Sequence, residues 1–151
     1  MTSNPDKFLE DVAVGDVRTA GPVEITQEAI IAFAKDYDPQ PFHIDPTAHS
    51  PFGGLIASGW HIAVLAMRQY VDQRPFGRTP VLGMGVDELR WLHPVRPGDK
   101  LDFRWEVIEV RRSASKPDRG QVRAQTTVTN QAGVKVMVYT SLAQVPARSP
   151  S

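Results

Sequence analysis

The sequence predicts an α+β domain in which an antiparallel sheet curves around one long apolar helix. The segment from Ser58 or Gly59 to Asp72 is apolar on nearly all sides of a helix, a pattern typical of a helix buried on most of its faces. Four long segments rich in β-branched and aromatic residues follow it, as expected for strands. Because a helix of this kind needs a curved partner surface, we expect the sheet to wrap it.

The first third of the chain predicts a strand followed by a short helix. The strand covers residues 17–25 and is interrupted at Gly21-Pro22, since proline cannot donate a hydrogen bond to a central ladder. Thr26 offers an N-cap for a helix whose apolar residues recur at helical spacing up to Asp36.

A long connection leads from this helix to the central one. Residues 37–54 are dense in proline and glycine, so we expect irregular structure there apart from one turn of helix at residues 46–49. Turn residues separate the later strands and favour antiparallel pairing of consecutive strands. The expected strands are residues 81–92, 101–112, 121–130 and 134–145, with connections at 94–100, 113–120 and 130–133.

One central helix and one antiparallel sheet form a hotdog-like arrangement. We interpret residues 1–151 as a single domain with polar tails at about residues 1–7 and 146–151. A sheet of this kind has exposed edges and a face that a second copy can cover. We therefore expect a homodimer or a dimer of dimers.

Composition argues against several classes of function. Lys plus Arg and Asp plus Glu each number 17, and no stretch gathers like charge, so neither a nucleic-acid nor a membrane partner is expected. The absence of cysteine removes disulfides and thiolate chemistry, and the four histidines match no common zinc spacing, so we expect no metal. Without a readable signal peptide or an apolar run near the ~18 residues of a membrane span, a cytoplasmic protein is expected.

The stretch YDPQPFHID places Asp38 and His43 five positions apart on a loop that two prolines stiffen. A carboxylate and an imidazole held on one rigid turn can share a water molecule and move its protons near neutral pH, which is a way to add or remove water. An alternative interpretation is also open. Asp before Pro often forms a turn, and a lone histidine is often structural.

A second feature is FGGLIASGWH, residues 52–61, in which small residues lead into the apolar helix. A glycine in the first turn, here Gly59, lets a ligand approach the backbone. Its N–H lies at the positive end of the helix dipole and can stabilise an enolate-like oxyanion. The alternative is that Ser58 is an N-cap and that Gly59 only relieves crowding against the sheet.

These two stretches and LRWLHPVRPGD resemble the MaoC-like dehydratase family, which includes the (R)-specific enoyl-CoA hydratases, from about Phe8 to Val145. The resemblance implies a hotdog homodimer whose interface holds an active site that reversibly hydrates trans-2-enoyl-CoA to (R)-3-hydroxyacyl-CoA. Asp38 and His43 match the family's catalytic pair, and Gly59 matches the glycine whose N–H receives the thioester oxygen. No cofactor is implied beyond the coenzyme A of the substrate.

Further residues near these positions are expected to contact the substrate. They are Gln40, Pro41, Phe42, Ser58 and Trp60. Two departures accompany the resemblance: Gln40 stands where the family often has Asn, and no Ser or Thr occurs between Gly59 and Gly77, where such hydratases can carry a supporting serine. A thioesterase or a non-catalytic acyl-thioester-binding protein is therefore an alternative function.

Three aromatic residues receive structural interpretations. His61 on the apolar helix is expected to be a hydrogen-bonded core histidine. Trp91 and Trp105, on expected strands, are interpreted as core or dimer-face residues.

Overall fold

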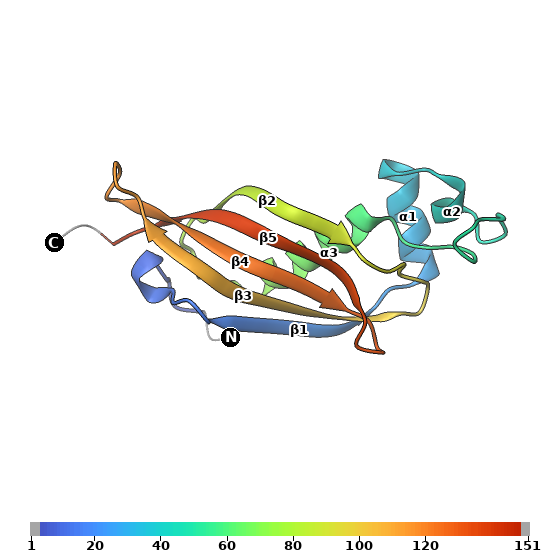
Figure 1. Cartoon of the computed structure of the whole chain (residues 1–151), viewed down its shortest axis with the longest axis horizontal. Coiled ribbons are helices and arrows are strands. Elements are labelled where there is room, and N and C mark those ends of the chain that lie inside the picture. The colour runs from blue at the N-terminus through green and yellow to red at the C-terminus, as the bar shows by residue number, and fades with distance from the viewer. Residues whose placement is uncertain (1–3, 149–151) are drawn as a thin grey trace.

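The computed structural model describes residues 4–148, which form one five-stranded antiparallel sheet with helices on one side and at one end (Figure 1). The strand order is β1-β3-β4-β5-β2. This confirms the predicted α+β hotdog fold. The elements in chain order are η1 (Leu9–Asp11), β1 (Val17–Glu24), α1 (Gln27–Tyr37), α2 (Pro41–Ile44), α3 (Gly59–Asp72), β2 (Leu82–Trp91), β3 (Lys100–Arg112), β4 (Arg119–Thr129) and β5 (Lys135–Pro146).

The predicted strands are confirmed to within two residues at each end, but one predicted pairing is wrong. β2 and β3 do not form a hairpin, because β2 pairs with β5 at one edge while β3 lies between β1 and β4. The connection between β2 and β3 instead crosses the end of the sheet. There the Ala57 N–H donates to the Val95 carbonyl (2.8 Å), and the Ile25 N–H donates to the Asp99 carbonyl (2.9 Å).

Helix α3 has the predicted bounds but not the predicted burial. Ile62 and Ala66 are buried against the sheet, on the one side of it where Figure 1 shows α3. The opposite face of the helix is apolar and exposed, with Val64, Met67 and Val71 at spacings of three and four residues. A single chain therefore covers only one face of a helix that is apolar on most sides.

The core between α3 and the sheet is built by alternation along β3. Leu101, Phe103 and Trp105 are buried at every second position, as expected for a strand with one covered face. The rings of Phe103 and Trp105 lie 6.1 Å apart and nearly parallel, and Tyr70 of α3 packs 5.3 Å from Trp105. An aromatic cluster thus fills the layer between helix and sheet.

The expected turn of helix at residues 46–49 is wrong, and a short helix forms at Pro41–Ile44 instead. Proline suits the first position of a helix, where its missing N–H would have no partner. In the segment where the turn of helix was expected, Asp45 accepts hydrogen bonds from the N–H (2.9 Å) and hydroxyl (2.7 Å) of Thr47. This side-chain turn competes with helical structure.

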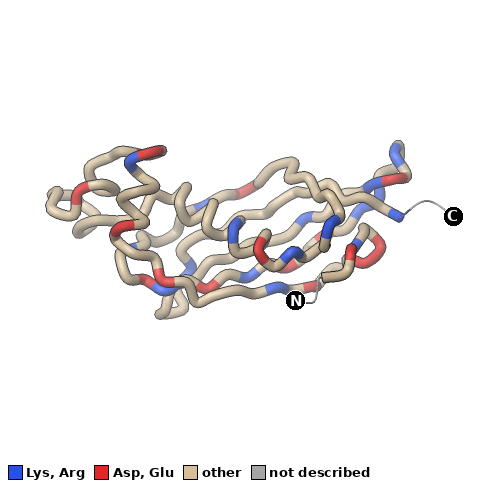
Figure 2. The backbone as a smooth tube through the Cα atoms, turned by 180° about the vertical axis from the view of Figure 1, so that it is seen from behind, with Lys and Arg blue, Asp and Glu red and all other residues tan. Residues whose placement is uncertain are grey.

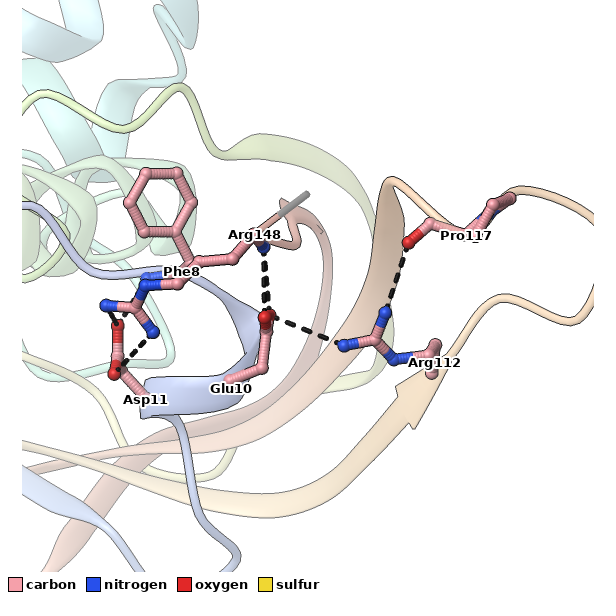
Figure 3. A network of polar contacts seen from close by, with 6 residues as sticks. All are labelled: Phe8, Glu10, Asp11, Arg112, Pro117 and Arg148. Atoms are coloured by element: carbon pink, nitrogen blue, oxygen red, sulfur yellow. Dashed lines mark hydrogen bonds and ion pairs between the residues drawn. The ribbon is translucent and has the colours of Figure 1, made fainter. Parts of the chain in front are cut away.

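The described parts of both expected tails contact the rest of the molecule. Asn4 donates to the carbonyls of Gln73 and Arg74 after α3. At the other end Arg148 forms two hydrogen bonds with Asp11 (2.7 and 2.9 Å) in a network around η1 (Figure 3). Residues 4–7 and 146–148 are therefore not free tails, whereas residues 1–3 and 149–151 lie outside the described part of the chain.

Charge is distributed as the composition suggested. Figure 2 shows positive and negative residues interspersed along the strands and loops. Many of them pair with a neighbour of opposite sign, as Arg123 does with Asp87 (2.8 Å). Within residues 4–148, none of the helices combines the length and the apolar character needed to cross a membrane.

The aromatic cluster yields a stability prediction. We expect Phe103→Ala to lower the free energy of unfolding by about 3–5 kcal/mol, because it removes a ring that is 1% exposed and leaves a cavity. Ile108→Ala, at a 41% exposed position of the same strand, should have a much smaller effect. Urea denaturation measures both values, and equal losses would contradict the described core.

Candidate active site

The structure brings Asp38 and His43 together at the end of the molecule where α1 and α2 meet. Asp38 is the C-cap of α1, and Pro39 and Pro41 turn the chain into α2, which carries His43. The Asp38 Oδ2 and His43 Nε2 atoms are 3.3 Å apart. The turn that contains the two prolines thus brings the carboxylate and the imidazole together, as expected from the sequence.

His43 is fixed from its other side by the segment that precedes α3. Its Nδ1 lies 2.7 Å from the carbonyl oxygen of Ile56, and the Ile56 N–H donates to the Phe42 carbonyl (3.0 Å). Because a carbonyl only accepts hydrogen bonds, Nδ1 must carry the ring proton. In the neutral imidazole, Nε2 is then an unprotonated base that faces the Asp38 carboxylate.

Asp38 accepts two further hydrogen bonds. The Gln40 side-chain amide donates to Oδ1 (2.7 Å), and the Ser58 hydroxyl donates to Oδ2 (2.8 Å). The hydrogen bond from Gln40 is the largest cause that lowers the pKa of Asp38; burial opposes it, and Ser58 and the charge of His43 lower the pKa further. Asp38 is therefore held as a carboxylate anion.

Ser58 stands at the N-cap position of α3, but its side chain does not cap the helix. The serine is fully buried, and its hydroxyl points to Asp38. A hydroxyl that binds Asp38 is therefore present directly before the helix, although none occurs between Gly59 and Gly77. The sequence alone does not predict this contact, because it spans 20 residues and depends on how α3 packs against α1.

His43 and Gly59 border a cavity of about 280 Å³ with mostly apolar walls. Among residues 4–148, the Gly59 N–H donates no hydrogen bond, so it is free to bind an acceptor. The other lining residues are Phe52, Ile56, Ala57, Ile62, Trp91, Leu92, His93, Pro94, Val95 and Val136.

The absence of a side chain at Gly59 also has a packing reason. A Cβ added to this residue would lie 2.3–2.5 Å from three atoms of the Trp91 indole. The alternative interpretation of Gly59, relief of crowding against the sheet, is therefore satisfied as well, and the two interpretations do not exclude each other.

The five residues expected to contact substrate do not line this cavity in the described structure. Gln40 and Ser58 bind Asp38, and Pro41 begins α2. Phe42 packs edge-on against His43, with 4.4 Å between ring centroids, and Trp60 is 56% exposed. The cavity residues that sequence analysis missed, Trp91 and His93, lie in the motif LRWLHPVRPGD, which was the available signal.

His61 differs from its expected role. It stacks on Phe33, with 4.8 Å between ring centroids, but its Nδ1 atom is buried without a hydrogen-bond partner among residues 4–148. Burial lowers the pKa of His61, so the ring stays neutral. Across the described chain, no three side chains of His, Cys, Asp or Glu gather in an arrangement suited to a metal ion.

Comparison with known proteins decides the family. A family model described as "MaoC like domain" matches residues 11–131, which is most of the chain. The chain belongs to the MaoC-like dehydratase family. This confirms the resemblance inferred from the three motifs and supports a hydratase or dehydratase activity for the domain.

Three individual proteins show the extent of the similarity. A crystal structure of the MaoC-like dehydratase from Rhodospirillum rubrum is 42% identical, covers 95% of this chain and 99% of its own, and superposes with a TM-score of 0.84. The R-hydratase PhaJ1 from Pseudomonas aeruginosa is 26% identical over 93% of this chain and 86% of its own, with a TM-score of 0.76. Nodulation protein N from Rhizobium meliloti is 34% identical over 68% of this chain and 70% of its own.

The hydrogen bonds to Asp38 yield a prediction about its titration. We expect Gln40→Ala to raise the pKa of Asp38 more than Ser58→Ala does, because Gln40 makes the larger contribution to lowering it. Carboxyl ¹³C NMR during an acid titration measures this directly. Asp45 is an internal control, since Thr47 lowers its pKa and neither substitution touches that contact. An Asp38 pKa unchanged in both variants would contradict the described contacts.

Proposed function

We propose that the protein catalyses the reversible hydration of a trans-2-enoyl-CoA to the (R)-3-hydroxyacyl-CoA. The observation that carries this proposal is the 3.3 Å pair of His43 Nε2 and Asp38 Oδ2 beside a largely apolar cavity that also contains Gly59. An unprotonated imidazole nitrogen, a carboxylate and a free backbone donor are the groups that water addition to an unsaturated thioester requires. The similarity to an R-hydratase supports the same chemistry.

In the hydration direction, His43 Nε2 accepts a proton from a water molecule whose oxygen attacks C3 of the substrate. The π electrons shift toward the thioester oxygen and form an enolate, and the Gly59 N–H donates a hydrogen bond to this oxygen. The imidazolium then returns its proton to C2. One water is thus divided between C3 and C2, and the enzyme ends in its starting state.

Asp38 acts in this mechanism as an anion and not as the base. A carboxylate that accepts hydrogen bonds from Gln40 and Ser58 and has a lowered pKa is a weak proton acceptor. Its negative charge close to Nε2 stabilises the imidazolium formed when His43 takes the proton. It can also orient the attacking water.

The structure favours the hydratase over a thioesterase or a non-catalytic acyl-thioester-binding protein on one specific point. The alternatives were considered because the central helix lacks a serine or threonine. Ser58, directly before this helix, donates a hydrogen bond from its hydroxyl to Asp38 (2.8 Å). The three activities differ in their products. A thioesterase releases free coenzyme A thiol, a hydratase consumes the double bond, and a binder does neither.

We expect Asp38→Asn and His43→Ala each to lower the rate of hydration by roughly 10² or more, because the first removes the negative charge that stabilises the imidazolium and the second removes the base. Loss of the conjugated thioester absorbance of crotonyl-CoA and longer enoyl-CoAs measures the rate, and a thiol reagent monitors hydrolysis in parallel. His49→Ala, an exposed histidine on the connection to α3, is the matched control and should retain full activity. Undiminished turnover in the Asp38 and His43 variants would rule out the mechanism.

We also propose that the active form is a homodimer. β2 is an edge strand that pairs only with β5 among the described strands, and it exposes Leu82, Met84 and Val86. The apolar outer face of α3 is exposed as well. A second copy can cover both surfaces and pair with the free edge, which a soluble monomer would otherwise leave open to aggregation.

The dimer has a direct test in light scattering coupled to size exclusion. The unmodified protein should run at twice the chain mass, and Met67→Arg should shift it toward the monomer because it places a charge on the exposed face of α3. Ile108→Arg, at a 41% exposed position of β3 away from this surface, should remain dimeric. A monomeric unmodified protein would contradict the proposal.

A further inference from the structure

Trp91 forms the wall of the cavity next to Gly59. Its indole occupies the space that a side chain at Gly59 would fill, with three ring atoms 2.3–2.5 Å from the Cβ position. The same ring borders the cavity that contains His43. A thioester whose oxygen reaches the Gly59 N–H must therefore place its acyl group alongside this indole.

A bulge in β2 directs Trp91 to this position. Asp87 pairs with Thr140 and Arg90 pairs with Val138, so β2 has one more residue than β5 between these pairs. The extra residue reverses the alternation of side chains beyond it and places Trp91 opposite Met137, which is fully buried. With regular pairing from Asp87 onward, Arg90 would stand opposite Met137. The bulge thus puts an aromatic ring, not a charge, beside the reacting groups.

The Trp91 indole, although 44% exposed, packs against a neighbouring indole. Trp60, in the first turn of α3, packs edge-on against it, with ring centroids 5.1 Å apart and planes at 76°. On the chain beyond Trp91, the Leu92 N–H donates to the Val136 carbonyl (2.9 Å) and extends the contact with β5. Moving the ring away from Gly59 would break the aromatic pair or disturb the edge of the sheet.

Buried core residues form one side of the cavity. Its inner wall consists of the buried residues Ile62, Val95 and Val136. These residues belong to the same hydrophobic core as Phe103 and Trp105, against which Tyr70 packs. A second cavity, of about 60 Å³ near the other end of α3, shares no lining residue with the first. The 280 Å³ space is small for an organic ligand, since such pockets usually measure about 300–1,000 Å³.

We propose that Trp91 sets the upper size of the acyl group, so that the protein acts on short-chain enoyl thioesters and discriminates against long ones. This proposal rests on the proposed hydratase function, because it concerns the acyl group of the same substrate. A longer chain has to displace the indole from its contacts with Gly59 and Trp60, whereas a crotonyl group fits beside the ring.

The test compares kcat/KM for crotonyl-CoA and trans-2-octenoyl-CoA in four proteins: the unmodified chain, Trp91→Ala, Trp91→Phe and Trp60→Ala. The unmodified protein should prefer crotonyl-CoA. Trp91→Ala should raise the octenoyl-to-crotonyl ratio by about tenfold or more, the scale that small changes in apolar pocket size produce. Trp91→Phe keeps a ring against Gly59 and should stay much closer to the unmodified ratio. Trp60→Ala, which removes an equal indole from outside the cavity, should change the ratio less than Trp91→Ala.

Two results would overturn the size limit while leaving the hydratase intact: equal kcat/KM for both substrates in the unmodified protein, or the same ratio in Trp91→Ala as in the unmodified protein. If Trp91→Ala does not fold, as judged by circular dichroism, Trp91→Leu replaces it under the same criteria. Failure of the hydratase function itself is distinguishable, because the unmodified protein would then convert no enoyl-CoA. In that case calorimetry with butyryl-CoA and octanoyl-CoA tests the size limit, and tighter binding of the longer chain by the unmodified protein overturns it.

Discussion

The hydrogen bond between His43 Nδ1 and the Ile56 carbonyl holds the candidate site together. It is 2.7 Å long and joins α2 to the segment that leads into α3. Because the carbonyl only accepts, the bond fixes both the orientation and the tautomer of the imidazole. The same segment then delivers Ser58 to Asp38 and begins α3 at Gly59, so the base, the carboxylate and the free N–H are all positioned relative to one contact.

Hydrogen bonds fix the two polar side chains of the site. Asp38 accepts one hydrogen bond on each of its oxygens, from Gln40 and Ser58, and His43 Nδ1 donates to the Ile56 carbonyl. In the neutral ring Nε2 has no donor or acceptor role toward Asp38 and keeps its lone pair for a proton. These hydrogen bonds matter because a buried polar group without a partner costs stability and tends to move. Water or substrate therefore meets side chains that already have defined positions, which is the preorganisation that acid–base catalysis needs.

Strand β2 links the site to the outer surface of the molecule. Beyond the bulge between Asp87 and Arg90 it presents Trp91 to the cavity, and before that bulge it exposes Met84 and Val86 at the free edge of the sheet. A second copy paired along this edge would lie beside the cavity wall. Trp91 in the cavity wall and the residues at the free edge of the sheet lie close together on β2. Pairing of two copies along this edge would therefore affect the cavity, and dimer formation and catalysis would depend on each other.

The sequence was sufficient to predict the helices, strands and turns that depend on residues close together in the chain. Periodicity located α3 and the strands, Thr26 is the N-cap of α1 as predicted, and the prolines around Gln40 do bring Asp38 close to His43. The features that it did not predict depend on tertiary packing. The pairing of β2 with β5, the contact of Ser58 with Asp38 and the indole over Gly59 each join residues that are far apart in the chain. Local patterns carry no information about such contacts.

The tautomer of neutral His43 can be measured directly. Two-bond ¹⁵N–¹H correlation spectra of the histidine-labelled protein, recorded where the ring is neutral, show which ring nitrogen carries the proton. We expect a proton on Nδ1, bound to the Ile56 carbonyl, and an unprotonated Nε2 beside Asp38. A neutral His43 with its proton on Nε2 would contradict it, because the ring would then have no base directed at the attacking water.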